Sequence, residues 1–263
     1  MWILPEQERL ASPNCNRNRV DKRGRKHELV DVLVLHYAVD GDQTKDGETE
    51  DLNFEPRLST DDCMDVARGF FRREREASAH FVIGRDGSKV QCVRTDDMAW
   101  HAGDGTLPRE GIGPVGAALP KRAYELNGRS IGIEICNVGW AVDKFGVSLG
   151  HIEAGLRHRN PASSSKRWES YRPAQYATLE YLAALLRQAV PSLRYVCGHE
   201  DVTHKDTLGK AGAKTDPGPA FDWDAVRWAD LGYQRVLYDF RLDAWVRAGD
   251  EVTRPIDVGG LRR

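Results

Sequence analysis

Short apolar runs along the chain predict the strands of a β-sheet. Residues 31 to 37, DVLVLHY, predict a buried strand because valine and leucine residues follow one another between polar flanks. Side chains alternate along a strand, so His36 shares a face with the valines and ends the strand where the sheet opens toward a cleft. Residues 78 to 93, SAHFVIGRDGSKVQCV, predict a hairpin with an Asp-Gly turn at positions 86 and 87. Residues 130 to 137, SIGIEICN, predict another strand.

Apolar residues at helical spacing predict three helices. The first is expected from an N-cap near residue 59 to about Glu76. The clearest begins at Pro173 with RPAQYATLEYLAALLRQAV and stops before Pro191. A third is expected over DWDAVRWADLG, residues 222 to 232.

Polar and irregular stretches separate these elements. Residues 1 to 28 are basic and polar and predict an arm over the surface. Residues 40 to 62 and 138 to 170 predict loop insertions, and residues 226 to 263 form a C-terminal extension with no clear pattern beyond the predicted helix. Between arm and extension, the order of strands and helices predicts a single α/β domain over residues 29 to 225, with a central mixed β-sheet flanked by helices.

The composition excludes several classes of partner. Lys and Arg total 38 against 40 Asp and Glu, a balance that favours neither nucleic acid nor an anionic membrane. No segment approaches the ~18 apolar residues of a membrane span, and the N-terminus lacks the basic start and apolar run of a secretory signal. The sequence therefore predicts a soluble, cytoplasmic protein, with export by a route that needs no cleaved signal left open. The oligomeric state is not predicted by any pattern.

The five cysteines are scattered and never spaced as C-x-x-C. An odd, dispersed set of thiols suits a reducing compartment better than a disulfide framework. They are Cys15, Cys63, Cys92, Cys136 and Cys197.

The stretch from Tyr195 to Trp223 carries two candidate metal ligands. Its short apolar strand ends at a Cys-Gly pair and delivers His199, and its polar loop closes on Asp216 within KTDPGP. Imidazole and carboxylate are donors that Zn²⁺ accepts, and a catalytic zinc takes three protein ligands with the fourth position open. The sequence therefore predicts a zinc site whose third ligand lies elsewhere in the chain.

The strand SIGIEICN places Glu134 among apolar residues. A buried carboxylate costs free energy unless it is paired or used in chemistry. Glu134 is therefore either a partner for a buried arginine or a functional acid or base.

Six segments together resemble the zinc-dependent N-acetylmuramoyl-L-alanine amidases, the fold group that includes amidase-type phage lysozymes and animal peptidoglycan recognition proteins. The resemblance covers about residues 30 to 225 and rests on the order of the motifs. They are VLHYA, SAHFVIGRDGSKVQCV, AWHAG, SIGIEICN, CGHEDV and KTDPGPAFDW.

The resemblance implies a zinc amidase domain with ligands at His36, His199 and Asp216. It implies that Glu134 is the general base, which takes the proton of water and passes it to the leaving amine. It also implies that Lys214 stabilises the negative charge of the tetrahedral intermediate. The insertions, the arm and the extension depart from the family pattern and put the choice of substrate in doubt.

Several alternatives stay open at individual residues. Taken alone, His36 is more typical of a hydrogen-bonded core histidine than of a metal ligand. Lys214 could equally be a solvated loop lysine. Cys197 is a rival soft ligand two residues before His199, although a small core residue is the favoured interpretation.

Three further residues are predicted near the substrate. Trp100 and His101 of AWHAG are expected to line the substrate groove, and His80 is expected to pack or orient groups beneath the site. The remaining histidines are predicted to have no role in the site, although the position of His204 merits a test. These are His27, His151, His158 and His204.

The function implied is hydrolysis of the amide between N-acetylmuramic acid and L-alanine in peptidoglycan or soluble anhydromuropeptides. A non-catalytic peptidoglycan-binding module is the first alternative, which the complete candidate ligand set argues against. The same chemistry used by a phage lysin or an effector delivered into competitors is the second, and the sequence does not choose between these roles.

Overall fold

The computed structural model of the 263-residue chain describes residues between positions 1 and 248, with several gaps. The expected insertion at 40 to 62 lies outside them, as do His151 and His204. The described residues are 1–20, 24, 26–27, 29–38, 63–70, 77–103, 105, 107, 126–137, 139, 152–160, 167–202, 214–239 and 244–248.

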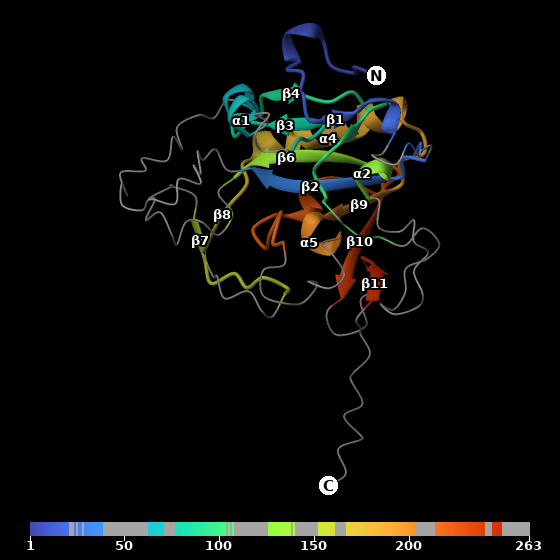
Figure 1. The fold of residues 1–263 in the computed structure, drawn as a ribbon. Coiled ribbons are helices and arrows are strands. Elements are labelled where there is room, and N and C mark those ends of the chain that lie inside the picture. Colours follow the sequence, from blue (N-terminus) through green and yellow to red (C-terminus); the bar gives the residue numbers. More distant parts are fainter. Residues whose placement is uncertain are drawn as a thin grey trace, which may run out of the picture.

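A mixed sheet of seven strands forms the centre of the molecule, in the order β11-β10-β9-β2-β6-β3-β4 (Figure 1). The neighbouring pairs from β10 to β3 are parallel, and β11 and β4 close the two edges antiparallel. The predicted α/β class with a central mixed sheet is confirmed. The strands are β2 (Val32–Ala38), β3 (Phe81–Ile83), β4 (Lys89–Gln91), β6 (Ser130–Cys136), β9 (Tyr195–Gly198), β10 (Gln234–Asp239) and β11 (Ala244–Arg247).

Two small antiparallel pairs accompany the central sheet. One joins β1 (Cys15–Asn16) to β5 (Met98–Ala99), and the other joins β7 (Ile152–Ala154) to β8 (Arg167–Glu169). The second pair lies within the stretch expected to be an irregular insertion, so part of that stretch is regular structure.

Strands β2 and β6 lie side by side along their full length. Each of the seven residues of β2 pairs in parallel register with one residue of β6. Leu33 and Leu35 pack into one apolar cluster, and Val32 and Val34 pack into another on the opposite face. Burial of both faces explains why the strand is a continuous apolar run rather than an alternating one.

Helix α4 (Pro173–Ala189) covers one face of the sheet (Figure 1). Its proline occupies the first turn, where no hydrogen-bond donor is needed, and Gln175 accepts from the Arg172 N–H at 2.9 Å. Leu179, Leu182 and Leu186 pack into the same cluster as Leu33 of β2. The predicted helix is confirmed at both ends.

Shorter helices lie around the rest of the sheet. α2 (Leu126–Arg129) and α5 (His199–Val202) contribute apolar residues to the cluster on the face opposite α4. α1 (Cys63–Phe70) packs against β3 and β4 and is the described part of the helix expected from residue 59 to Glu76. The short 3₁₀ turns are η1 (Glu6–Glu8), η2 (Arg17–Arg19) and η6 (Trp223–Ala225).

The predicted hairpin is β3 and β4, which pair antiparallel across the expected turn. Gly87 adopts a φ of 86°, a conformation that favours glycine. A Cβ there would also lie 2.9 Å from the Ala174 carbonyl oxygen of α4. The turn therefore packs directly onto the start of that helix.

The helix predicted over residues 222 to 232 is wrong. Only η6 is helical there, and turns follow it. Trp223, Val226 and Trp228 are all buried in one cluster. Positions 223 and 228 differ by about 140° around an α-helix, so a helix would not bury all three against the same surface.

The C-terminal extension contributes two strands, β10 and β11, to the central sheet. Val236, Leu237 and Tyr238 of β10 are buried, and Trp245 of β11 is fully buried. The sequence showed no clear pattern in this stretch, and the short run of apolar residues at 236 to 238 was the available signal for β10.

The N-terminal residues are not confined to the surface. Leu4 is 1% exposed and joins the cluster beneath α4, and Arg19 is 3% exposed. The Arg19 guanidinium donates to the carbonyl oxygens of Thr95, Gly128 and Ser130 at 2.9 to 3.1 Å. The segment expected as a surface arm thus anchors the loop at Thr95 and the junction of α2 and β6.

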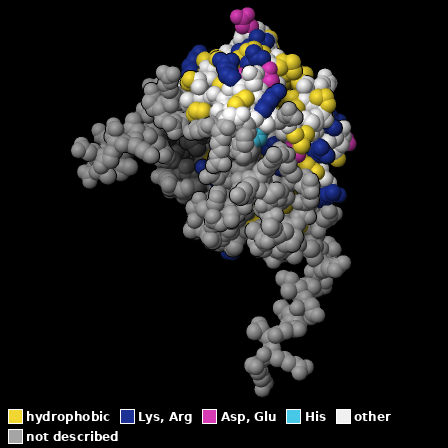
Figure 2. Space-filling model, turned by 45° about the vertical axis from the view of Figure 1, so that its right-hand side comes forward, with side chains coloured by type: hydrophobic (Ala, Val, Ile, Leu, Met, Phe, Trp, Pro, Cys, Tyr) yellow, Lys and Arg dark blue, Asp and Glu magenta, His cyan; other side chains and the backbone are white. Residues whose placement is uncertain are grey.

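Lys and Arg side chains are interspersed with hydrophobic and neutral ones over the described part of the face in Figure 2. Among the described residues, no helix has both the length and the apolar character that crossing a bilayer requires.

Candidate metal centre and active site

His36 lies near the carboxyl end of β2, directly opposite Glu134 of β6 in the parallel register. Residues paired in this way point to the same face, so imidazole and carboxyl project from the sheet together. β9 is the other neighbour of β2 and is also parallel. The carboxyl ends of parallel strands form the edge at which open α/β sheets bind ligands.

His199 follows β9 immediately and begins the single turn of α5. The Gly198 N–H donates to Asp201 Oδ2 at 3.0 Å, which ties the end of the strand to the turn. A Cβ on Gly198 would lie 2.6 Å from the Pro217 ring, so glycine permits the loop carrying Asp216 to approach.

Asp216 reaches the site from this loop. The Glu200 N–H donates to the Asp216 carbonyl oxygen at 2.9 Å, and the Tyr171 hydroxyl donates to the Pro217 carbonyl oxygen at 2.8 Å. The first bond fastens the loop to α5 beside His199, and the second fastens it to the segment before α4. Residues from three distant parts of the sequence are thereby fixed at one point.

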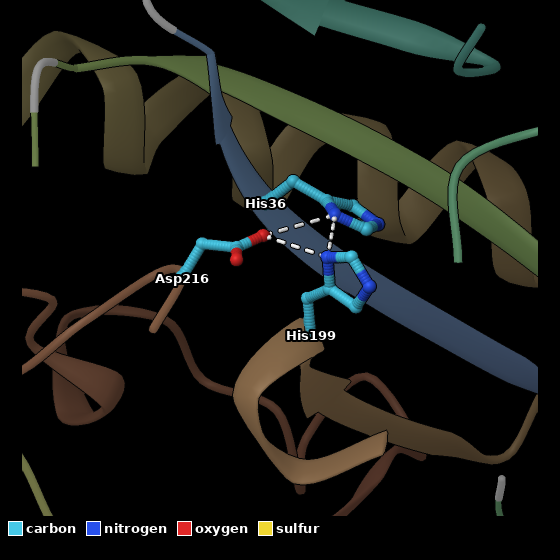
Figure 3. Close-up of side chains that lie close together, drawn as sticks. All are labelled: His36, His199 and Asp216. Carbon is cyan, nitrogen blue, oxygen red and sulfur yellow. Dashed lines mark hydrogen bonds and ion pairs between the residues drawn. The ribbon is translucent and has the colours of Figure 1, made fainter. Parts of the chain in front are cut away.

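Three ligand atoms converge there, as Figure 3 shows. His36 Nδ1 lies 3.0 Å from His199 Nδ1, and Asp216 Oδ2 lies 3.1 Å from each of the two nitrogens. Zinc bonds of ~2.0 to 2.1 Å in tetrahedral geometry separate ligand atoms by about 3.3 Å. The donor types and their spacing therefore fit a zinc ion bound by two imidazoles and one carboxylate.

Burial and mutual proximity shift the protonation of these groups. Burial, reinforced by His199, lowers the pKa of His36 to about 4 despite the neighbouring carboxylate. Burial alone would raise the pKa of Asp216, but the His199 and His36 rings hold it well below its usual range. A neutral imidazole and an ionised carboxylate are the forms that bind a metal ion.

Glu134 is 4% exposed, and its Oε2 atom has no hydrogen-bond partner among the described residues. Burial, followed by the negative charge of Asp216, raises its pKa well above the usual value, and Lys214 opposes this shift. No described arginine holds its Oε2 atom, which weakens the alternative of a structural ion pair. Lys214 itself is exposed, two residues before Asp216.

The His101 ring lies over strand β6 and contacts the His36 ring. Its Nδ1 atom is 2.9 Å from His36 Nε2, and its Nε2 atom is 3.0 Å from the Ser130 hydroxyl oxygen. A Cβ on Gly132 would lie 2.5 Å from the His101 ring, so the glycine leaves the space that the ring fills. Substrate contact by His101 stays a prediction.

The other two residues predicted near the substrate differ in burial. Trp100 is partly buried, and its indole N–H donates to Asn16 Oδ1. His80 is fully buried, accepts from the Gly132 N–H at 3.0 Å, and donates to the Asp97 carbonyl oxygen at 3.1 Å. His80 therefore holds β6 from beneath, and contact of either residue with substrate is not tested by this geometry.

Cys197, the rival ligand, packs in the apolar cluster with Val32 and Val34. Its thiol lies outside the group of atoms formed by His36, His199 and Asp216. The geometry thus agrees with the interpretation of Cys197 as a small core residue.

His158, which was predicted to have no role, contacts Glu200 of α5, the turn that carries His199. Its ring hydrogen bonds to Glu200 and stacks on Trp168, and Arg159 donates to both Glu200 and Asp201. Sequence reasoning missed this contact because it joins positions about forty residues apart. Three charged residues in HRNP and HEDV were the only local signal.

A family model described as N-acetylmuramoyl-L-alanine amidase matches residues 23–219. The chain belongs to this family. The predicted family resemblance and the amidase activity it implies are therefore confirmed, and the family is zinc-dependent. The match also covers both stretches that were expected as insertions.

Two curated amidases from Escherichia coli strain K12 are similar to the chain. It is 23% identical to N-acetylmuramoyl-L-alanine amidase AmiD over 99% of this chain and 77% of the relative. It is 29% identical to 1,6-anhydro-N-acetylmuramyl-L-alanine amidase AmpD over 57% of this chain and 56% of the relative. The alignment with AmpD thus spans little more than half of that relative's length.

A crystal structure of a selenomethionine derivative of AmpD resembles the fold. The TM-score is 0.50 at 23% identity, and the similarity covers 85% of this chain and 94% of the other. The amidase fold is therefore shared by the two chains.

Proposed function

We propose that this amidase binds a catalytic zinc ion through His36 Nδ1, His199 Nδ1 and Asp216 Oδ2. The convergence of these three atoms within 3.1 Å of one another carries the proposal. Three ligands leave the fourth position of a tetrahedral site open, as in catalytic zinc centres. When bound, zinc supplies a Lewis acid for the amide carbonyl and lowers the pKa of water toward ~7.

Glu134 is proposed as the general base. It projects from the same sheet face as His36, one strand away. Its Oε2 atom is buried without a partner among the described residues, so the carboxylate is available to a proton. Its raised pKa brings the group closer to the value at which a base both accepts and returns a proton near neutral pH.

Lys214 is proposed to stabilise the negative charge that develops on the carbonyl oxygen. Its positive charge lowers the pKa of both His36 and Glu134, which supports a role close to these two side chains. A cation beside the reacting carbonyl lowers the free energy of the tetrahedral transition state more than that of the substrate.

The substrate is proposed to be a soluble muropeptide that carries the N-acetylmuramoyl-L-alanine amide. The AmpD relatives are 1,6-anhydro-N-acetylmuramyl-L-alanine amidases, and their name supports this choice. Digestion of a 1,6-anhydromuramoyl peptide beside intact sacculi, with products identified by mass, tests it. Release of the free stem peptide from the soluble substrate alone supports the proposal, and release from sacculi alone contradicts it.

The ligand assignment predicts that His199→Ala and Asp216→Ala each lose stoichiometric zinc. Each substitution removes one of three protein ligands, and elemental analysis of the purified variants measures the effect. Stoichiometric zinc in both variants would show that the ion is bound elsewhere. Cys197→Ala, which removes the rival ligand, is expected to retain zinc.

The base assignment predicts that Glu134→Gln retains zinc but loses turnover by at least ~10²-fold, because glutamine has the same size but does not accept the proton. Steady-state hydrolysis of the soluble substrate and zinc analysis of the same sample measure the two effects. Loss of zinc from this variant would make Glu134 a ligand instead. Wild-type protein that binds zinc and releases no peptide would indicate a binding module.

A further inference from the structure

We propose that His101 and Ser130 are positioning residues that hold His36 in the tautomer whose Nδ1 lone pair faces the metal. They form a chain of hydrogen bonds that runs from the backbone of α2 to the His36 ring. The inference rests on the proposed zinc site, because it explains how one of its ligands is oriented.

The chain of hydrogen bonds begins at the Leu126 carbonyl oxygen, which can only accept a hydrogen. The Ser130 hydroxyl donates to the Leu126 carbonyl oxygen at 2.6 Å. A hydroxyl carries a single hydrogen, so the Ser130 oxygen is left as an acceptor. It therefore receives the His101 Nε2 hydrogen across 3.0 Å.

The donor-to-acceptor direction of these hydrogen bonds continues through the His101 ring. The His101 ring is buried against the His36 ring and the Ser130 hydroxyl, neither of which would offset a buried positive charge, so the ring is neutral and carries one hydrogen. With that hydrogen on Nε2, the His101 Nδ1 atom is an acceptor. It receives the His36 Nε2 hydrogen across 2.9 Å.

His36 is consequently left with an unprotonated Nδ1 atom. This is the atom 3.0 Å from His199 Nδ1 and 3.1 Å from Asp216 Oδ2. No hydrogen from His36 bridges these contacts, so its lone pair points toward the other ligand atoms. Partners on the second ring nitrogen of a metal-bound histidine fix its tautomer and orientation in this way.

The strand β6 is built to hold this chain. Ser130, Gly132 and Glu134 alternate along one face, opposite Val32, Val34 and His36 of β2. A Cβ at position 132 would lie within 2.8 Å of three atoms of the His101 ring. The pattern S-x-G-x-E therefore supplies an anchor for His101, space for its ring, and the proposed base.

The tautomer can be read directly in zinc-free protein. Long-range ¹H–¹⁵N correlation spectra of protein labelled at histidine separate protonated from unprotonated ring nitrogens at neutral pH. The expected result is hydrogen on Nε2 of both His36 and His101, with each ring assigned from the spectrum of its own variant. Hydrogen on His36 Nδ1 in the wild-type protein would overturn the proposal.

A matched pair of variants tests the consequence for metal binding. His101→Asn places an amide oxygen near the position of the His101 Nδ1 atom, whereas His101→Leu has a similar size and no acceptor. Competition with a chromophoric chelator is expected to show zinc affinity within about threefold of wild type for Asn, and a loss of 10- to 100-fold for Leu. Equal affinity of the Leu variant and the wild type would overturn the proposal.

Ser130→Ala decides the question if the Leu variant does not fold, as judged by circular dichroism. Without the hydroxyl, His101 is expected to populate both tautomers, and the His36 signals are expected to become mixed. A single, unchanged His36 tautomer in this variant would overturn the proposal. Wild-type protein that binds no zinc would refute the proposed metal site, while the spectra of the zinc-free protein still test the hydrogen-bond chain.

Discussion

Glu134 differs from the other acidic residues of the site in its surroundings. Asp216 is held by two imidazoles, whereas the Oε2 atom of Glu134 is buried without a partner among the described residues. Burial favours the protonated form of a carboxyl group, and hydrogen bonds favour the ionised form. The two carboxyls therefore have opposite pKa shifts within one site, which suits a ligand and a base.

The raised pKa of Glu134 predicts a pH-dependent stability of the zinc-free protein. The folded state binds this proton more tightly than the unfolded state, so the stabilisation is complete below the unfolded pKa of ~4.3 and is lost as pH rises toward the folded pKa. Each unit between the two values corresponds to about 1.4 kcal/mol. Urea unfolding from pH 4.5 to 8 is expected to show wild type losing stability relative to Glu134→Gln. Two curves that stay parallel would contradict the raised pKa.

The roles of individual residues were predictable where a motif carried them. His36, His199, Asp216 and Glu134 stand in an ordered set of short motifs, and the structure brings the first three together. The contribution of Ser130 was not predictable. It depends on a histidine at position 101 lying over β6, a contact that no local pattern encodes.

At the scale of elements, α5 is the short helix that connects the site to the edge of the sheet. Asp201 accepts from the Gly198 and Tyr238 N–H groups at 3.0 and 2.9 Å, and from Arg159 at 2.5 Å. The Trp245 indole donates to the Asp201 carbonyl oxygen at 2.9 Å. One buried turn thus joins β9, β10, β11 and the segment before β8.

Asp201→Ala is predicted to destabilise the protein by about 3 to 5 kcal/mol, because it leaves two buried backbone donors without their acceptor and removes one of the two carboxylates that bind Arg159. Chemical denaturation of the variant measures the loss. Asp224→Ala is the matched control, since Asp224 is exposed in η6, and it is expected to change stability by no more than about 0.5 kcal/mol. Similar effects of both changes would refute the structural role of Asp201.

Elements were predictable where one pattern determined them. β2, the hairpin, β6 and α4 each show a clear local pattern of apolar or turn residues and appear as expected. Residues 222 to 232 have good helical composition, yet their buried Trp223, Val226 and Trp228 contact a surface that a helix would not follow. Tertiary packing overrides local propensity there.

At the scale of the whole molecule, the N-terminal residues belong to the folded unit. Arg19 binds three carbonyl groups, one from the loop at Thr95 and two from the junction of α2 and β6, and Leu4 joins the main apolar cluster. These contacts span about 75 to 110 positions of sequence, which explains why a basic, polar stretch was expected to lie on the surface.

Arg19→Met is predicted to lower stability by about 2 to 4 kcal/mol, because buried carbonyl groups lose a charged donor. In a domain of this size, each kcal/mol lowers Tm by about 2 to 4 °C, so calorimetry detects the change. Arg17→Met is the control from the same turn, with a side chain 77% exposed and a 3.8 Å ion pair to Asp97 worth at most about 1 kcal/mol. Equal Tm values for the two variants would contradict the anchoring role.

The seven-residue register between β2 and β6 has a consequence for folding fidelity. A slip of one position would turn Ser130, Gly132 and Glu134 to the far side of the sheet all at once. The anchor and the space for the His101 ring would be lost together with Glu134, the proposed base. A mispaired chain is therefore expected to be inert as an amidase rather than promiscuous, because the correct pairing of the two strands and the proposed catalytic site depend on the same register.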